Sequence, residues 1–173
     1  MEKWDILNSL GDIVGKIAVR GKTPLKSGEY HLVVHIWVIS SDGKLLVQRR
    51  SDTKKLMPGE WAATGGSAIC GETSFCAAQR ELLEELGIRL IARNSKCMSR
   101  IKKRNAFVDL WFTKCDVQIS ELSLQSSEVA CAKWVTKKEL KNMVDAGEFH
   151  NYGDEYFNTV FKCAEEFLNE FTN

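Results

Sequence analysis

The segment of residues 72–87 restricts the fold of this chain more than any other part of the sequence. It has no internal glycine or proline, and it ends at Gly87, which readily adopts the left-handed conformation that closes a helix. On a period of 3.6 residues its large apolar side chains share one side of a helix: Phe75, Leu82 and Leu86. Three glutamates share the other side: Glu81, Glu84 and Glu85. The segment therefore predicts an amphipathic helix that packs by one face and presents carboxylates on the other.

These carboxylates repel one another. Glu81 and Glu85 lie four residues apart, and like charges at that spacing destabilise a helix. A divalent cation removes the repulsion, because hard ions such as Mg²⁺ or Mn²⁺ take carboxylate, water and phosphate oxygens as ligands. Taken alone, the three glutamates also fit an ordinary solvated helix surface.

The rest of the chain predicts a mixed α/β domain. The expected strands are residues 4–8, 13–19, 30–39, 44–50, 97–103, 107–115 and 131–135. The first two are read as an N-terminal hairpin within residues 1–20, and the next two as a second hairpin. A capping box at Thr136 opens a second helix that stops near Gly147, and a third helix covers residues 154–168. No repeat or linker interrupts the sequence, so residues 1–173 are expected to form one domain with a mixed sheet covered by helices.

Composition argues against several classes of protein. A net charge of +1 lacks the clustered basic excess of a protein that binds a nucleic acid polymer. The longest apolar run, residues 32–39, is far too short to cross a membrane. The six cysteines show no CxxC pair or zinc spacing, and the N-terminus has no secretory pattern. We therefore expect reduced thiols and a cytoplasmic protein.

The residues around the three glutamates follow a complete motif. Gly66 is followed after five residues by Glu72, and after seven more by the run Arg80-Glu81-Leu82-x-Glu84-Glu85-x-Gly87-Ile88. This pattern resembles the Nudix box, GX5EX7REUXEEXGU with U an aliphatic residue, at every constrained position. The chain is thereby similar to the Nudix hydrolases, and the order of its strands and helices extends the resemblance beyond residues 66–88. The resemblance implies an α/β/α sandwich in which the box forms a loop, a helix and a loop.

The resemblance also implies roles for individual residues. Glu81, Glu84 and Glu85 would bind divalent ions, and one of them would act as general base. The backbone carbonyl of Gly65 would complete the metal site, with Glu128 as a further candidate ligand that also fits a solvated loop. Glu72 and Arg80 would tie the loop to the helix. The implied reaction is metal-assisted hydrolysis of a diphosphate bond in a nucleoside diphosphate derivative or related small molecule.

Cations near the box are candidates for substrate binding. They lie at the end of residues 44–50 and in the loop that follows: Arg49, Arg50, Lys54 and Lys55. Arginine suits bidentate contacts to phosphate, although such residues are also common on solvated loops. Four aromatic residues could stack on a base or belong to the core: Trp37, Phe107, Trp111 and Tyr152.

Two other readings of the chain compete with hydrolysis. Residues 57–61 and His31 also resemble isopentenyl-diphosphate isomerases of the Nudix fold, but this chain has Ala62 and Ala63 where that family places its catalytic cysteine. A non-catalytic nucleotide-binding module is the second alternative, and loss of box glutamates, which would favour it, is not seen. The sequence leaves open whether the protein forms a homodimer.

Overall fold

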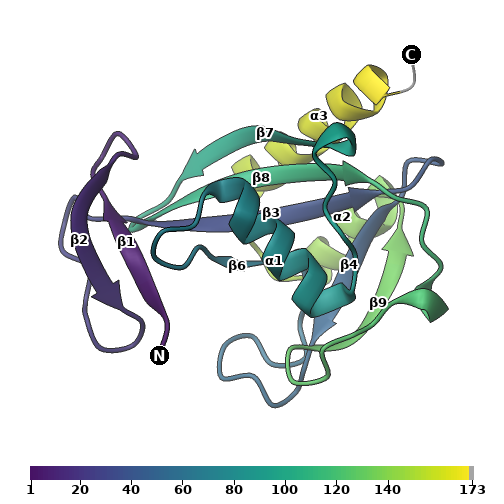
Figure 1. The fold of residues 1–173 in the computed structure, drawn as a ribbon. Helices are drawn as coiled ribbons and strands as arrows, with labels where there is room; N and C mark the ends of the chain where they lie inside the picture. Colours follow the sequence, from purple (N-terminus) through teal and green to yellow (C-terminus); the bar gives the residue numbers. More distant parts are fainter. Residues whose placement is uncertain (172–173) are drawn as a thin grey trace.

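The computed structural model describes residues 1–171 and contains a mixed β-sheet between two layers of helices (Figure 1). The strands of this sheet are β3 (His31–Ile39), β4 (Leu45–Arg50), β5 (Trp61–Ala62), β6 (Thr64–Ser67), β7 (Ser95–Lys102), β8 (Ala106–Lys114) and β9 (Val129–Val135). Their main order is β5-β4-β3-β8-β7, with β6 also paired to β3 and β9 to β4. Helix α1 (Ser74–Leu86) covers one face, while α2 (Lys137–Asp145) and α3 (Asp154–Phe171) cover the other. The predicted α/β/α sandwich is confirmed; residues 172–173 of the expected domain lie outside the described residues.

Strand β3 contributes to both halves of the core, because successive side chains on a strand point to opposite faces of the sheet. Val34, Ile36 and Val38 pack under α1. Trp37 and Ile39 pack on the other face, beneath α2 and α3. The strand runs parallel to β8 over its full length, so it is buried on both faces and its sequence is almost continuously apolar.

The N-terminal hairpin is present as expected and stands beside the main sheet (Figure 1). It consists of β1 (Lys3–Leu7) and β2 (Ile13–Val19), which form a separate two-stranded antiparallel sheet. A bridge between Leu7 and Tyr30 joins it to the start of β3. Both bridge amides are bonded, since each residue's N–H donates to the other's carbonyl at 2.8 and 3.0 Å.

The expectation of a second hairpin is wrong for most of its length. Strands β3 and β4 are paired only at their turn, through Ile39 and Leu45. Beyond the turn, β6 occupies the edge of β3, and β4 pairs instead with β5 and β9. The sequence did not predict β5 or β6, because both are very short and Gly65 and Gly66 weaken the strand signal of β6.

The helix ends follow the sequence closely. Thr73 caps α1 by accepting a bond from the N–H of Cys76 at 3.2 Å, and Gly87 closes the helix with φ of 74°. Helix α2 begins with the predicted capping box at Thr136. Helix α3 continues three residues beyond its expected end at residue 168. In the described part of the chain, no helix has the length and apolar character needed to span a membrane.

Candidate active site

A cleft of about 440 Å³ opens where α1 meets β6 and the loops at the ends of β4 and β9. Its lining includes most of the predicted site residues. The polar and charged members are Glu2, Arg20, His35, Arg50, Lys54, Ser67, Arg80, Glu81, Glu84, Glu85, Gln125, Glu128 and Tyr152. Gly65 and Gly66 lie on the same surface. The fold thus gathers residues from both ends of the chain around the glutamates of α1.

Glu81 lies against β6, where a glycine is needed. A Cβ atom at Gly66 would stand only 2.3 Å from Glu81 Oε1, so any other residue at this position would displace the carboxylate. Arg80 Nη1 donates to the same oxygen at 2.8 Å. Burial raises the pKa of Glu81 even though Arg80 opposes that rise.

Glu85 is the most enclosed of the three carboxylates, with its residue only 4% exposed. Gln48 Nε2 donates to its Oε2 at 2.8 Å, and the N–H of Gly65 does so at 3.3 Å. Burial is the main cause that raises the pKa of Glu85 to about 7. The alternative of a fully solvated helix face is therefore wrong: Glu85 points toward the sheet, and only Glu84, with a side chain 51% exposed, faces solvent substantially.

Arg80 connects the box loop to the helix. Its Nε and Nη2 donate to the two oxygens of Glu72 at 2.8 and 3.0 Å, and Nη2 also bonds the carbonyl of Ser67 at 3.1 Å. On the helix, Nη1 reaches Glu84 at 3.3 Å as well as Glu81. The expected contact between Glu72 and Arg80 is present, and it orients the first part of the box relative to the glutamates.

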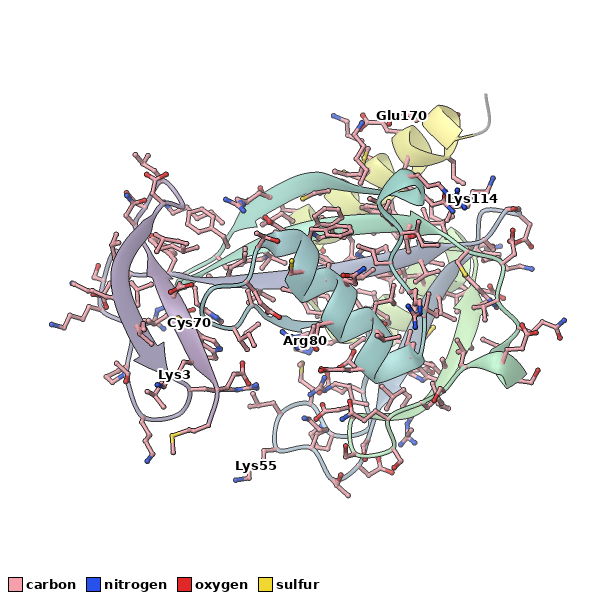
Figure 2. All side chains as sticks on the ribbon, in the orientation of Figure 1. Lys3, Lys55, Cys70, Arg80, Lys114 and Glu170 are labelled. Carbon is pink, nitrogen blue, oxygen red and sulfur yellow. The ribbon has the colours of Figure 1, made fainter. Side chains whose placement is uncertain are left out.

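The four candidate cations divide into two pairs. Arg50 and Lys54 line the cleft. Arg49 does not: its Nε bonds the carbonyl of Gly59 at 2.9 Å, and its Nη2 pairs with Asp52. Arg49 and Arg50 are successive residues of β4, and only Arg50 lines the cleft. Lys55 is also outside it, and Figure 2 shows its side chain extending outward from the loop after β4, away from α1.

Glu128 belongs to the cleft, at the start of β9. Its carboxylate pairs with Lys54 Nζ at 2.5 Å. The pair adds one negative and one positive group to the lining of the cleft. As it stands, Glu128 is engaged with a lysine, while its charge also contributes to the raised pKa of Glu85.

The donor chemistry of the cleft suits a hard divalent cation. Burial disfavours the charged forms of Glu81 and Glu85, and a cation would offset that cost. Within residues 1–171 no three acidic, histidine or cysteine side chains stand ready to hold a metal ion. Arg80 binds Glu81 and Glu84, and Gln48 binds Glu85, so these carboxylates would have to turn from their partners to bind an ion.

Several cleft residues were not expected from the sequence. Glu2 and Arg20 come from the N-terminal hairpin, and His35 and Gln125 from the main domain. No motif marks them, because they reach the cleft only through tertiary contacts. Of the four aromatic candidates, only Tyr152 lines the cleft; the others belong to the core or pack against it: Trp37, Phe107 and Trp111.

The isomerase alternative finds no support in the geometry. None of the six cysteines lines the cleft in the described chain. His31 is also outside its lining and stacks on Trp4 with ring centroids 4.2 Å apart. Ala63 occupies the wall where that chemistry would need a thiol.

An α/β/α sandwich that directs the glutamates of a loop–helix–loop box into a cleft defines a Nudix-type protein. A family model described as the NUDIX domain matches residues 29–153. An uncharacterised Nudix hydrolase of Listeria monocytogenes is 42% identical over 88% of this chain and 90% of its own length. The chain therefore belongs to the Nudix family, whose hydrolases act on pyrophosphate bonds and generally use divalent metals such as Mg²⁺.

Two further relatives support the assignment. Nudix hydrolase 3 of Arabidopsis thaliana is 32% identical over 83% of this chain, although the match covers only 20% of that longer protein. A crystal structure from Deinococcus radiodurans is 25% identical and superimposes with a TM-score of 0.78, covering 94% of this chain and 99% of that one. A match to 94% of this chain includes at least part of the N-terminal region that precedes residue 29.

Proposed function

We propose that this protein is a Mg²⁺- or Mn²⁺-dependent hydrolase that cleaves the diphosphate bond of a small molecule, with nucleoside diphosphate derivatives as the preferred class. The observation that carries the proposal is the meeting of three box glutamates with Arg50 and Lys54 in one cleft. The carboxylates can hold a divalent metal ion, and the positively charged side chains can hold phosphate groups. A diphosphate with its metal needs both.

The roles of the residues follow from their positions. Glu81, Glu84 and Glu85, with the backbone carbonyl of Gly65, would hold the metal, which when bound supplies charge neutralisation and an acidified water. One of the glutamates accepts the proton of the attacking water. Arg80 and Glu72 do not touch substrate; they position Glu81 and Glu84 through the hydrogen bonds described above.

Substrate binding falls to the cationic and aromatic side chains of the cleft. Arg50 Nε bonds the carbonyl of Leu56, which fixes the guanidinium while leaving its terminal nitrogens for a phosphate. Lys54 would provide a second positive charge when it exchanges Glu128 for substrate. Tyr152 supplies an apolar surface next to these groups for the organic part of the substrate.

The test is an activity screen with matched variants. The purified protein is incubated with Mg²⁺ or Mn²⁺ and a panel of nucleoside di- and triphosphates, ADP-ribose, NADH, nucleotide sugars, CoA and isopentenyl diphosphate, and products are followed by mass. We expect hydrolysis of at least one diphosphate compound. Glu84→Gln should lower kcat by more than about a hundredfold, beyond the usual cost of losing an outer-shell partner of a metal site.

Glu155→Gln is the control, because Glu155 is exposed in the first turn of α3 and outside the cleft. It should behave as the unaltered protein, and chelation of the metal should abolish turnover in both. Isomerisation of isopentenyl diphosphate without hydrolysis of any compound would refute the proposal. Tight nucleotide binding without turnover would instead favour the non-catalytic module.

A further inference from the structure

The N-terminal hairpin contributes two side chains to the cleft although it precedes the region that the family model matches. That match begins at residue 29, whereas Glu2 and Arg20 line the same cleft as Glu81 and Glu84. Arg20 follows directly after β2, and Glu2 directly before β1. The hairpin therefore adds a wall, with a charge of each sign, to a site whose carboxylates come from the box.

The hairpin is fixed to the box loop and does not hang freely. The N–H of Cys70 donates to the carbonyl of Lys3 at 2.8 Å, and the N–H of Gly71 donates to Asp5 Oδ2 at 2.7 Å. Figure 2 shows Cys70 and Lys3 next to each other where the loop meets β1. Stacking of Trp4 on His31 adds a contact with β3. The position of the hairpin is thus coupled to the same loop that leads into α1.

Glu2 orients the Arg20 side chain. Glu2 Oε2 accepts a bond from Arg20 Nη1 at 2.7 Å, and its Oε1 accepts one from Trp4 Nε1 at 2.7 Å. Burial raises the pKa of Glu2, but the bonds from Trp4 and Arg20 outweigh burial, and the net pKa is below the ordinary value. Glu2 is therefore ionised at neutral pH and holds the guanidinium at the cleft wall.

Like Arg50, Arg20 retains unused hydrogen-bond donors, whereas Arg80 and Lys54 are engaged by carboxylates. Arg80 is committed to Glu72, Glu81 and Glu84, and Lys54 is paired with Glu128. Within residues 1–171, Arg20 Nε and Nη2 make no hydrogen bond, and the side chain is 51% exposed. A guanidinium with one edge anchored and its other donors open is suited to bind an anionic oxygen.

We infer that Arg20 is a substrate-binding residue that contacts a phosphate oxygen of the diphosphate compound on the hairpin side of the cleft. The inference rests on the proposed function, because it assumes that the cleft takes a phosphorylated substrate. The cleft therefore has cations from two parts of the chain. Arg50 and Lys54 come from β4 and the loop that follows it, and Arg20 comes from the hairpin. The glutamates of α1 lie in the same cleft as both groups, so one phosphate can be held while its neighbour meets the metal.

Steady-state kinetics of four variants test this assignment on whichever compound the activity screen identifies. Arg20→Gln removes the charge and should raise KM roughly ten- to hundredfold, the range expected for a lost charged hydrogen bond, while kcat stays within about threefold. Arg20→Lys keeps the charge but loses the planar donor pair, so its KM should lie between those of the unaltered protein and Arg20→Gln. Lys22→Gln is the matched control, because it removes an exposed cation two residues away that does not line the cleft.

Glu2→Gln separates substrate contact from a structural ion pair. If Arg20 binds phosphate, Glu2→Gln leaves the positive charge of Arg20 in the cleft and therefore raises KM by less than Arg20→Gln does. Equal effects of the two substitutions, or a KM for Arg20→Gln within twofold of the unaltered protein, would overturn the inference. Thermal unfolding of each variant shows whether a change in its kinetics comes from partial unfolding of the protein.

A binding measurement distinguishes failure of the inference from failure of the proposed function. Calorimetry with a methylene-bridged nucleoside diphosphate, which cannot be hydrolysed at that bridge, needs no turnover. Weaker binding to Arg20→Gln than to Lys22→Gln supports Arg20 even in a protein that hydrolyses nothing. Equal binding to both contradicts it even in an active hydrolase.

Discussion

Gly66 and Gly65 are adjacent, yet each is required for a different reason. At Gly66 the atoms nearest to an added Cβ all belong to the end of the Glu81 side chain, with Oε1 at 2.3 Å. At Gly65 it would stand 2.0 Å from the backbone oxygen of Val34, in the partner strand β3. A side chain can turn away, whereas a backbone carbonyl inside a sheet cannot do so without breaking strand pairing. The first glycine therefore places a carboxylate, and the second allows two strands to approach.

We predict that alanine at position 66 lowers activity and that alanine at position 65 lowers stability. Gly66→Ala should leave the free energy of unfolding within about 1 kcal/mol of its original value but lower kcat/KM by roughly tenfold or more, because Glu81 is displaced. Gly65→Ala should destabilise the protein by about 2–4 kcal/mol through backbone strain. Denaturant unfolding and kinetics on the same samples measure both quantities. A Gly66→Ala protein with full activity would show that the position of Glu81 is not critical.

His35 gives the fold a dependence on acid. Its Nδ1 lies 2.7 Å from Tyr156 Oη, its ring contacts Tyr152, and burial lowers its pKa to about 3. The unfolded chain takes up a proton near pH 6.5 and the folded protein does not, so this histidine's contribution to stability is complete above about pH 6.5. It is lost as the pH falls from 6.5 toward 3, by at most about 1.4 kcal/mol per pH unit.

The prediction for His35 is a difference between two proteins. His35→Gln keeps a polar group near Tyr156 but has no proton to gain, so its stability should fall less steeply between pH 6.5 and 4 than that of the original protein. Urea unfolding at several pH values measures both slopes. Parallel slopes would mean that His35 is protonated in the folded state at these pH values.

At the scale of elements, the helices could be predicted from the sequence and the sheet order could not. Thr73, Gly87 and Thr136 act through neighbours three or four residues away, so local patterns mark the ends of α1 and the start of α2. Strand β6 exists because a distant strand offers it an edge, and nothing in its own four residues reveals that partner. The same limit applied to the site: the box glutamates were predicted, while Glu2, Arg20 and His35 were not.

The first turn of α1 is attached to the sheet by a buried carboxylate. Asp109 on β8 is 2% exposed and accepts a bond from Ser74 Oγ at 2.5 Å. It also receives two bonds from Arg100 on β7, at 2.6 and 2.8 Å, while Trp111 Nε1 donates to Ser74 Oγ. One side chain thus connects the beginning of the glutamate-bearing helix to two strands.

Removing the charge of Asp109 should loosen this connection. We expect Asp109→Asn to destabilise the protein by about 2–3 kcal/mol, because charge-assisted hydrogen bonds are lost and a buried amide replaces a matched carboxylate. Asp145→Asn, at an exposed position at the end of α2, is the control and should change stability by less than about 0.5 kcal/mol. Thermal or urea unfolding compares the two, and similar values would show that the Asp109 network contributes little.

For the molecule as a whole, the cleft is the place where the structure holds unfavourable charge. Glu81 and Glu85 are carboxylates whose charged forms are disfavoured by burial, and neighbouring carboxylates raise the pKa further: Glu84 acts on Glu81, and Glu81 on Glu85. Arg80 and Gln48 compensate only in part. An ion that binds the folded cleft and not the unfolded chain must therefore stabilise the entire protein.

We predict that Mg²⁺ or Mn²⁺ raises the melting temperature without any substrate. At ten times the dissociation constant the gain is about 1.4 kcal/mol, which corresponds to roughly 3–6 °C for a domain of this size. Differential scanning calorimetry of metal titrations measures the shift, and chelation should reverse it. Glu84→Gln should reduce the shift strongly and Glu155→Gln should retain it; an equal shift in both variants would place the stabilising ion elsewhere, and the absence of any shift would leave the three glutamates without the metal that the proposed hydrolysis requires.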